Sequence, residues 1–218
     1  MRFTGFFLTL SFRFLLAAAF SLAGLLAHAD IQPGKEYELV SPPEAVETGK
    51  KIEVLEIFSY VCPHCYHLEP YLNKWEKQLP KDVEFRRLPG IFRDSWIPFA
   101  KMFYTFEAMG LTDKLHDKFF SAIHEQNARF DDNNALFDWV EKQGVNRKSF
   151  ANTFSSFAIQ SKAMRAQQQT KAYGITGVPA IIVDGKYRAY VPTTGGQAAL
   201  LATVDQLIKQ ARRERAGK

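Results

Sequence analysis

The stretch that organises this chain reads Phe58-Ser59-Tyr60-Val61-Cys62-Pro63-His64-Cys65-Tyr66-His67-Leu68. An apolar, β-rich run ends within it, a helix-like run begins, and the only two cysteines of the chain lie at the junction. A cysteine at a helix start faces unpaired backbone N–H groups and the positive end of the helix dipole, which favour the thiolate. We therefore interpret Cys62 as the attacking sulfur and Cys65, about one turn later on the same face, as the resolving sulfur.

Two other uses of this cysteine pair remain open at this stage. A structural disulfide that closes so short a loop would remove little entropy from the unfolded chain, so it would stabilise the fold only weakly. A metal site is the sharper alternative, because Cys62, His64, Cys65 and His67 all offer donor atoms. Structural zinc sites usually take two ligands from a distant segment, and the chain has no second CxxC or HxxxH motif. We expect no metal and no cofactor other than a redox-active disulfide.

The first 29 residues have the composition of a secretory signal peptide. Arg2 and Arg13 are their only charged residues, the segment from Phe14 to Leu26 is largely apolar, and Ala27-His28-Ala29 fits a small-x-small cleavage site. An uncleaved anchor is the alternative, but an apolar core of roughly 13 residues is short for a membrane span. We therefore expect the protein to be exported.

The composition of the chain bounds its class. The 218 residues are 46% hydrophobic and 23% charged, which is ordinary for a globular protein with a sizeable core. Without the two arginines of the first 29 residues, the 28 basic residues fall to 26 against 23 acidic ones, a net charge near +3. So mild a charge does not indicate a nucleic-acid partner, and with no coiled-coil or repeat signal we expect a monomer. A lone CxxC in an exported chain is typical of catalysis, because chains stabilised by disulfides usually carry more cysteines.

A buried strand is predicted to lead into the cysteines. The apolar run after Lys51 contains Ile52, Val54, Leu55, Ile57 and Phe58. Glu56 interrupts this run on the face of Ile52 and Val54, where burial should raise its carboxyl pKa. A carboxyl six residues before Cys62 could exchange protons with Cys65, whereas a solvated sheet edge would give Glu56 no role.

The rest of the chain predicts an interrupted α/β arrangement. A helix from the CxxC motif to about Gln78 and a second strand over 83–88 predict a parallel pair, with its chemistry at the carboxyl end of the first strand. Apolar residues then recur at helical spacing up to about residue 170 without a convincing strand, which predicts an inserted helical subdomain. His116 and His124 lie in this region without a partner motif, and we expect both on the surface.

The β pattern returns at Gly177-Val178-Pro179-Ala180-Ile181-Ile182-Val183. Asp184-Gly185 then predicts a hairpin turn, and an amphipathic helix closes the chain. Proline at a strand entrance cannot donate a ladder hydrogen bond, and the Val178–Pro179 bond is a candidate cis peptide.

Together these features resemble the DsbA family of thiol:disulfide oxidoreductases. The resemblance is sharpest at Glu56, in the run from Phe58 to Tyr66, and at Gly177-Val178-Pro179-Ala180. A CxxC motif alone indicates only the thioredoxin superfamily. The Pro63-His64 dipeptide, together with the export signal and the helical insertion, narrows the resemblance to DsbA.

The resemblance implies an α/β thioredoxin fold with an inserted all-helical subdomain. The corresponding division is a cleaved signal peptide at 1–29, thioredoxin-fold parts at 30–95 and 171–218, and the helical subdomain at 96–170. It also implies a cis Val178–Pro179 bond beside the disulfide, where Val178 and Pro179 would bind substrate as an added strand. Pro63 and His64 would belong to the catalytic motif, with His64 adding positive charge or a hydrogen bond to the Cys62 sulfur.

The function that the resemblance implies is a periplasmic dithiol oxidase. Such a protein donates its Cys62–Cys65 disulfide to newly exported polypeptides and is reoxidised by a DsbB-type, quinone-linked membrane partner. A disulfide isomerase or reductase is the alternative within redox chemistry, although isomerases of this superfamily generally gain a dimerisation domain, which the short arm before Lys51 does not provide. A redox-inactive binding or chaperone module and a metal carrier are the alternatives outside it.

Overall fold

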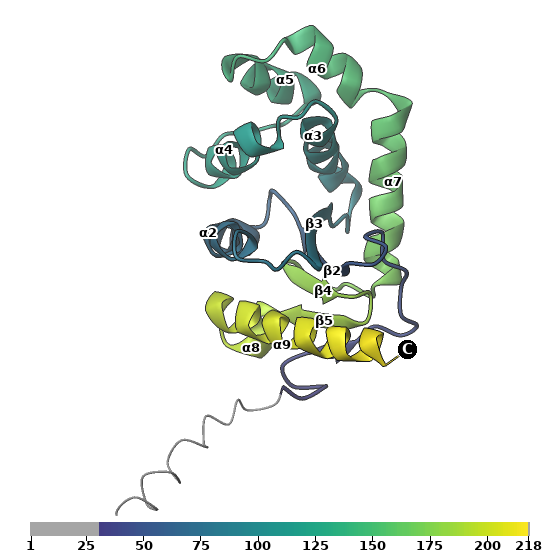
Figure 1. Cartoon of the computed structure of the whole chain (residues 1–218). Helices are drawn as coiled ribbons and strands as arrows, with labels where there is room; N and C mark the ends of the chain where they lie inside the picture. The colour runs from purple at the N-terminus through teal and green to yellow at the C-terminus, as the bar shows by residue number, and fades with distance from the viewer. Residues whose placement is uncertain (1–30, 218) are drawn as a thin grey trace, which may run out of the picture. The chain divides into compact units, whose positions relative to one another are not determined.

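The computed structural model describes residues 31–217, so the predicted signal peptide at residues 1–29 lies outside the described part of the chain (Figure 1). The elements in chain order are β1 (Glu38–Leu39), β2 (Ile52–Phe58), α2 (Pro63–Glu76), β3 (Val83–Pro89), the short 3-10 helix η1 (Asp94–Trp96), α3 (Ile97–Ala108), α4 (Thr112–His124), α5 (Asn133–Lys142), α6 (Arg147–Phe154), α7 (Phe157–Ala172), β4 (Ala180–Val183), β5 (Tyr187–Tyr190), α8 (Val191–Thr194) and α9 (Gln197–Ala216). Within residues 31–217, no helix is both long enough and apolar enough to cross a membrane.

The strands form one five-stranded sheet in the order β1-β5-β4-β2-β3. Strands β2 and β3 are parallel, as the strand–helix–strand pattern predicts, and the other neighbours are antiparallel. All seven residues of β2 are buried, which fits a strand covered on both faces. The strand that leads to Cys62 is therefore paired on both edges, with β4 and β3, and covered on both faces.

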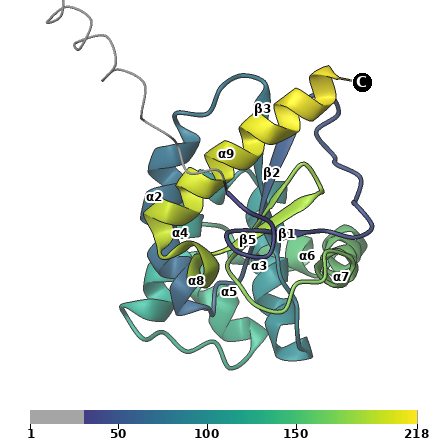
Figure 2. The same ribbon diagram turned by 90° about the horizontal axis from the view of Figure 1, so that it is seen from below.

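Helices cover both faces of the sheet. Figures 1 and 2 show α9 lying across one face, while α3 to α7 lie on the other side of the sheet. Ile52 and Val54 of β2 share a core with α2 and α9, whereas Leu55 and Ile57 share a core with the helices from α3 to α7. This alternation along β2 puts Glu56 on the α2 side, the face on which its interactions are made.

The helical segment α3–α7 runs from Ile97 to Ala172 with no strand in between. Its interior is aromatic, with Phe103, Phe106, Phe119 and Phe150 buried. Residues 31–217 pack as one compact unit. The division into the predicted domains stays a prediction.

The turn between β4 and β5 has the predicted chemistry. Asp184 and Gly185 both have positive φ, at 54° and 66°, as the two central positions of a type I′ turn require. A Cβ on Gly185 would lie 2.1 Å from the Glu44 carbonyl oxygen, so the packing of the N-terminal arm also requires glycine there.

Candidate active site

Cys62 is the residue that caps the start of α2. Its backbone is extended, and Pro63 follows in the first helical turn, where its fixed φ suits a helix start. Cys62 is 9% exposed. A hydrogen bond from the Cys65 thiol lowers the Cys62 pKa from 9.0 to about 6 against the effect of burial, aided by the backbone N–H groups of Cys65 and His64 and by the His64 charge. Cys62 is therefore mostly thiolate at neutral pH.

Cys65 lies one turn further along α2, in the opposite environment. It is fully buried. Burial, followed by the interaction with Cys62 and the charge of Glu56, raises the Cys65 pKa well above its ordinary value. Both cysteines are free thiols in the structure, so these shifts describe the reduced form. In that form Cys62 carries the negative charge and Cys65 keeps its proton.

The entrance to β4 lies against Cys62. The Val178–Pro179 bond is cis, as predicted. The Cys62 sulfur lies 3.4 Å from the carbonyl oxygen of Val178, to which the thiol can donate a weak hydrogen bond. A cavity of about 420 Å³ opens beside this contact, and its lining includes His64, Val178, Pro179, Tyr190, Val191 and Pro192. We call this cavity the Pro179 groove.

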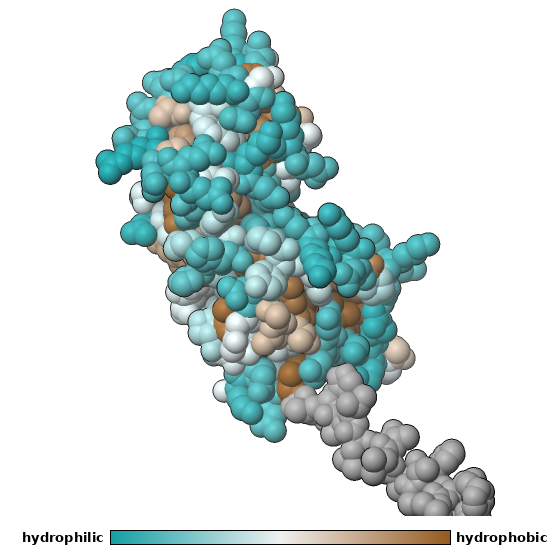
Figure 3. Space-filling view, turned by 90° about the vertical axis from the view of Figure 1, so that its left-hand side faces the viewer, coloured by the Kyte–Doolittle hydropathy of each residue, from teal (hydrophilic) through white to brown (hydrophobic). Residues whose placement is uncertain are grey.

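A second cavity borders the residue before Cys62. It measures about 600 Å³, and its lining includes Val61, Arg93, Trp96, Phe99, Phe130 and Leu136. Figure 3 shows one face of the molecule, on which apolar side chains gather within a mainly hydrophilic surface. Apolar and aromatic side chains thus line hollows on the active-site loop as well as at the entrance to β4.

A buried carboxyl lies on the strand that leads to the cysteines. The register of β2 and β3 places Glu56 beside Arg87, and Glu56 is 0% exposed. Arg87 Nε lies 3.2 Å from Glu56 Oε2, but the atoms are not aligned for a hydrogen bond, and neither Glu56 oxygen has a hydrogen-bond partner within the described chain. Burial, and then the charge of Glu69, raises the Glu56 pKa well above 4.5 despite Arg87. Glu56 therefore retains its proton more readily than an ordinary carboxyl.

A chain of polar contacts continues from Arg87 to the loop before Cys62. Arg87 Nη2 donates to Glu69 Oε2 at 3.1 Å, Glu69 Oε1 lies 3.2 Å from His116 Nε2, and His116 Nδ1 lies 2.7 Å from Tyr60 Oη. Burial is the largest influence on Glu69 and opposes ionisation, but the contacts with His116 and Arg87 outweigh it and lower the Glu69 pKa. The two buried carboxyls therefore differ: Glu69 is ionised and Glu56 favours its protonated form.

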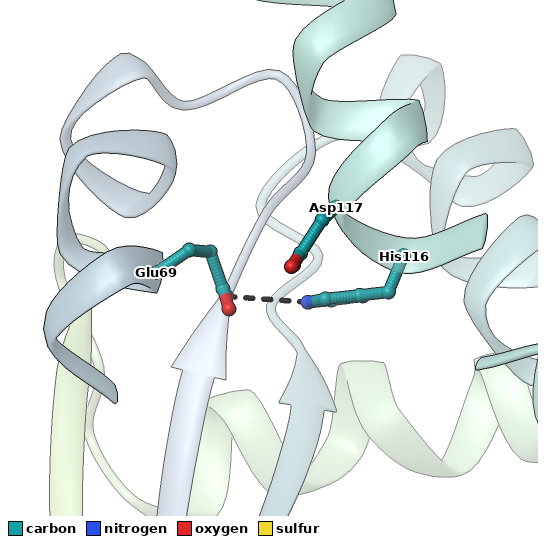
Figure 4. Close-up of side chains that lie close together, drawn as sticks. All are labelled: Glu69, His116 and Asp117. Atoms are coloured by element: carbon teal, nitrogen blue, oxygen red, sulfur yellow. Dashed lines mark hydrogen bonds and ion pairs between the residues drawn. The ribbon is translucent and has the colours of Figure 1, made fainter. Parts of the chain in front are cut away.

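One group of side chains has donor atoms at metal-binding spacing. The atoms of Glu69, His116 and Asp117 lie within 4.8 Å of one another, and Figure 4 shows Glu69 and His116 pointing toward each other. Glu69 already binds the guanidinium of Arg87, so a positive charge lies where a cation would bind. Asp117 accepts a hydrogen bond from Asn73. These donors fit a satisfied polar network rather than a metal site.

Comparison with known proteins agrees with this geometry. Residues 87–201 match the sequence profile of the DSBA-like thioredoxin domain. The chain is 41% identical over 196 residues to the thiol:disulfide interchange protein DsbA of Pseudomonas syringae pv. tomato, which covers 89% of this chain and 92% of that protein. The crystal structure of Pseudomonas aeruginosa DsbA is similar with a TM-score of 0.82 at 39% identity, covering 87% of this chain and 98% of the other. The oxidoreductase NmDsbA1 from N. meningitidis reaches a TM-score of 0.77 at 27% identity, covering 86% and 97%.

The chain belongs to the DsbA family. It is a thiol:disulfide oxidoreductase. Its predicted fold class, an α/β thioredoxin fold with a helical insertion, is confirmed.

The structure brings the predicted DsbA-family residues together. Cys62, Pro63, His64 and Cys65 form the start of α2, Val178 and Pro179 adjoin the Cys62 sulfur, and Glu56 lies on the buried side of the site. What each of these residues contributes to the reaction stays a prediction.

Sequence reasoning missed the polar residues behind the cysteines. The prediction that His116 is on the surface was wrong, because His116 is 5% exposed and sits between Tyr60 and Glu69. His124 is half-buried and its Nε2 donates to the Tyr60 carbonyl oxygen at 2.7 Å. The sequence could have indicated Glu69, because a residue four positions after Cys65 lies on the same face of the helix as Cys65.

Proposed function

We propose that this DsbA-family protein is a dithiol oxidase that donates a Cys62–Cys65 disulfide to reduced, newly exported polypeptides. The observation that carries the proposal is the position of Cys62 at the start of α2, where the Cys65 thiol and the first backbone N–H groups of the helix lower its pKa. A change from 9.0 to about 6 corresponds to roughly 4 kcal/mol in favour of the thiolate. At pH 7, ionisation of such a thiol stabilises the reduced protein by about 1.4 kcal/mol, or about 30 mV in potential. The disulfide becomes the stronger oxidant to that extent.

Donation begins when a substrate thiolate attacks the Cys62 sulfur. The Cys62–Cys65 bond breaks, a substrate–Cys62 disulfide forms, and Cys65 leaves with the electron pair. The high pKa of Cys65 means that its sulfur takes up a proton, and we assign the donor as Glu56, which is buried and whose charge affects Cys65 directly. A second substrate thiolate then attacks the substrate sulfur and releases Cys62 as a thiolate. Two substrate thiols are oxidised and the protein is left as a dithiol.

The surroundings of Cys62 suit an unfolded polypeptide. An extended substrate can pair with the backbone at Val178 as an added strand, with its side chains in the Pro179 groove. His64 lines that groove and also contributes to the low pKa of Cys62. Apolar lining favours chains whose hydrophobic residues are still exposed, which describes a polypeptide before folding.

A disulfide donor must be reoxidised after each cycle. We infer that a DsbB-type, quinone-linked membrane protein supplies the oxidant, and that the protein reaches the periplasm through its predicted signal peptide. We further propose that the protein acts as a monomer without metal or cofactor, because thiol exchange needs only the two sulfurs. Activity that survives a chelator, and a monomer mass in solution, are the expected results.

The deciding experiment is the reduction potential of the Cys62–Cys65 pair, measured at equilibrium in glutathione buffers. A donor should lie well above the value of about −270 mV that is typical of thioredoxin, toward the oxidising end near −120 mV. A thioredoxin-like potential would instead make the protein a reductant or isomerase. Retention of all activity by the double variant Cys62→Ala, Cys65→Ala would indicate a binding or chaperone module.

A further inference from the structure

We propose that His116 is a positioning residue for disulfide donation: from the helical insertion it holds Glu69 in its pair with Arg87, which leaves the buried proton of the site on Glu56. The proposal rests on the proposed role of Glu56 as the proton donor to Cys65. It gives the helical insertion a part in the exchange reaction beyond covering the sheet.

The buried cluster holds two carboxyls near one guanidinium. Glu56 and Glu69 are 0% and 3% exposed, and within the described chain Arg87 is the cation that contacts both. One guanidinium compensates one carboxylate, and a second buried charge without compensation is costly. The remaining carboxylates nearby are outer ones: Glu76 lies 3.8 Å from Arg87, and Asp117 is bound to Asn73. One of the two buried carboxyls must therefore keep its proton.

The hydrogen bonds around His116 run in one direction. The ionised carboxylate of Glu69 can only accept, so His116 Nε2 carries a proton and donates to it. In the neutral imidazole Nδ1 then accepts from the Tyr60 hydroxyl, 2.7 Å away. A doubly protonated ring would leave that buried hydroxyl without an acceptor among the contacts of the described chain. Tyr60 thus selects the tautomer that donates to Glu69.

Hydrogen bonding favours ionisation of Glu69 over ionisation of Glu56. Among residues 31–217, Glu69 accepts two hydrogen bonds, one from His116 and one from Arg87, whereas Glu56 accepts none. Hydrogen bonds to the charged form favour that form. Without His116, Glu69 would lose one of its two donors, and Arg87 Nε, already 3.2 Å from Glu56, would stabilise Glu56 as the anion instead. The proton would shift away from the carboxyl that acts on Cys65.

Helix α4 holds the imidazole in place by a second contact with the active-site loop. His124, two turns after His116, donates to the carbonyl oxygen of the same Tyr60. The ring of Tyr66, next to Cys65, stacks on His124 with centroids 5.1 Å apart. Phe120 packs against both His116 and Tyr60. The position of His116 is therefore tied to the loop that carries Cys62.

The test compares His116→Leu with His116→Gln. Glutamine keeps one donor for Glu69 and one acceptor for Tyr60, while leucine keeps neither. Oxidised protein is mixed with reduced glutathione between pH 5 and 9, quenched with acid, and the mixed disulfide is quantified by mass spectrometry. We expect His116→Leu to form the mixed disulfide about tenfold more slowly at pH 7. This loss is smaller than the roughly 100-fold or greater acceleration that a general acid typically provides, because Glu56 itself is still present. The variant-to-wild-type ratio should fall further as pH rises, because Glu56 would lose its proton at lower pH, and His116→Gln should restore both rate and profile.

Two further variants separate the possible outcomes. Phe119 lies on the same helix as His116, and its buried ring packs on the ring of Tyr60 but makes no hydrogen bond to the polar chain. Phe119→Leu should therefore lower the melting temperature and leave the pH profile unchanged. If Glu56→Gln slows the reaction but His116→Leu keeps the wild-type profile, the proposal for His116 is overturned while Glu56 keeps its role. If Glu56→Gln has no effect, the proton-donor role fails, and the proposal for His116 fails with it. With either result, the reduction potential of the Cys62–Cys65 pair remains an independent test of the oxidase function.

Discussion

Cys62 and Cys65 lie on one helix, three residues apart, yet the molecule gives them opposite properties. Cys62 caps the helix, touches the Pro179 groove and has a lowered pKa. Cys65 lies over the buried cluster that includes Glu56 and has a raised pKa. The difference shows that the reactivity of a CxxC motif comes from what surrounds each sulfur. The Cys62 sulfur can react and leave as a thiolate, whereas the Cys65 sulfur takes up a proton when it is released.

The largest expected effect separates the two sulfurs directly. At pH 7 a thiol with pKa about 6 is mostly thiolate, whereas one with a pKa above 9 is less than about 1% thiolate. A thiolate of lower pKa is also a weaker nucleophile, but Cys65 is fully buried as well as protonated. We therefore expect reduced Cys65→Ser, which keeps Cys62, to react with glutathione disulfide at least about 100-fold faster than reduced Cys62→Ser. Mass spectrometry of the mixed disulfide over time measures both rates. Equal rates would mean that the two environments do not differ as the structure indicates.

The second effect is the dependence of stability on pH. The Cys62 pKa is lowered in the folded state, so its contribution to stability is fully present above the unfolded pKa and is lost as pH falls through about 6. We expect the reduced protein to gain up to roughly 4 kcal/mol over reduced Cys62→Ser between pH 5 and pH 9. Urea unfolding of both proteins across this range measures it. A difference that does not change with pH would contradict the lowered Cys62 pKa, since titrating groups that do not interact with Cys62 cancel in the comparison.

The third effect concerns the buried side of the motif. Glu56→Gln removes the proton that we assign to Cys65 and should slow formation of the mixed disulfide by about tenfold. The Cys62 pKa, read from the pH dependence of alkylation, should remain near 6 because Glu56 is not among its main causes. An unchanged exchange rate would remove Glu56 from the reaction.

The smallest expected effect comes from the packing of Gly90 against Val178, which lines the Pro179 groove. A Cβ on Gly90 would lie 3.1 Å from Ile57 Cγ2 and 3.2 Å from Val178 Cγ1, so Gly90→Ala must displace Val178 slightly. We expect a loss of about 1 kcal/mol in stability and a two- to threefold slower exchange. Gly217→Ala, at the end of α9 and away from the groove, is the control, because a Cβ there meets only the Arg213 carbonyl oxygen at an ordinary 3.7 Å. If the two alanine variants exchange at the same rate, the position of Val178 does not matter at that scale.

Local signals in the sequence sufficed for much of the fold. The β2 run, the CxxC helix start, the Asp184-Gly185 turn and the last helix each depend on a few consecutive residues whose backbone preferences agree. The position of Cys62 at a helix start and the burial of Glu56 follow from the same local patterns. These features were predictable because period and capping are properties of neighbouring residues.

The polar cluster could not be predicted in this way. Arg87 joins Glu56 only through the register of β2 and β3, and His116 arrives from an insertion 47 residues after Glu69. His116 is one polar residue on a helix face that otherwise buries apolar side chains, and nothing in its own sequence neighbourhood indicates a carboxylate partner.

The groups that could react are therefore recognisable from the amino-acid sequence: two cysteines at a helix start, a proline at a strand entrance and a carboxyl in a buried strand. The charge on each titratable group depends on contacts that form only in the folded protein. The physical reason is that a pKa depends on burial and on charges within a few ångströms, and those neighbours come from strands and helices that are distant in the chain.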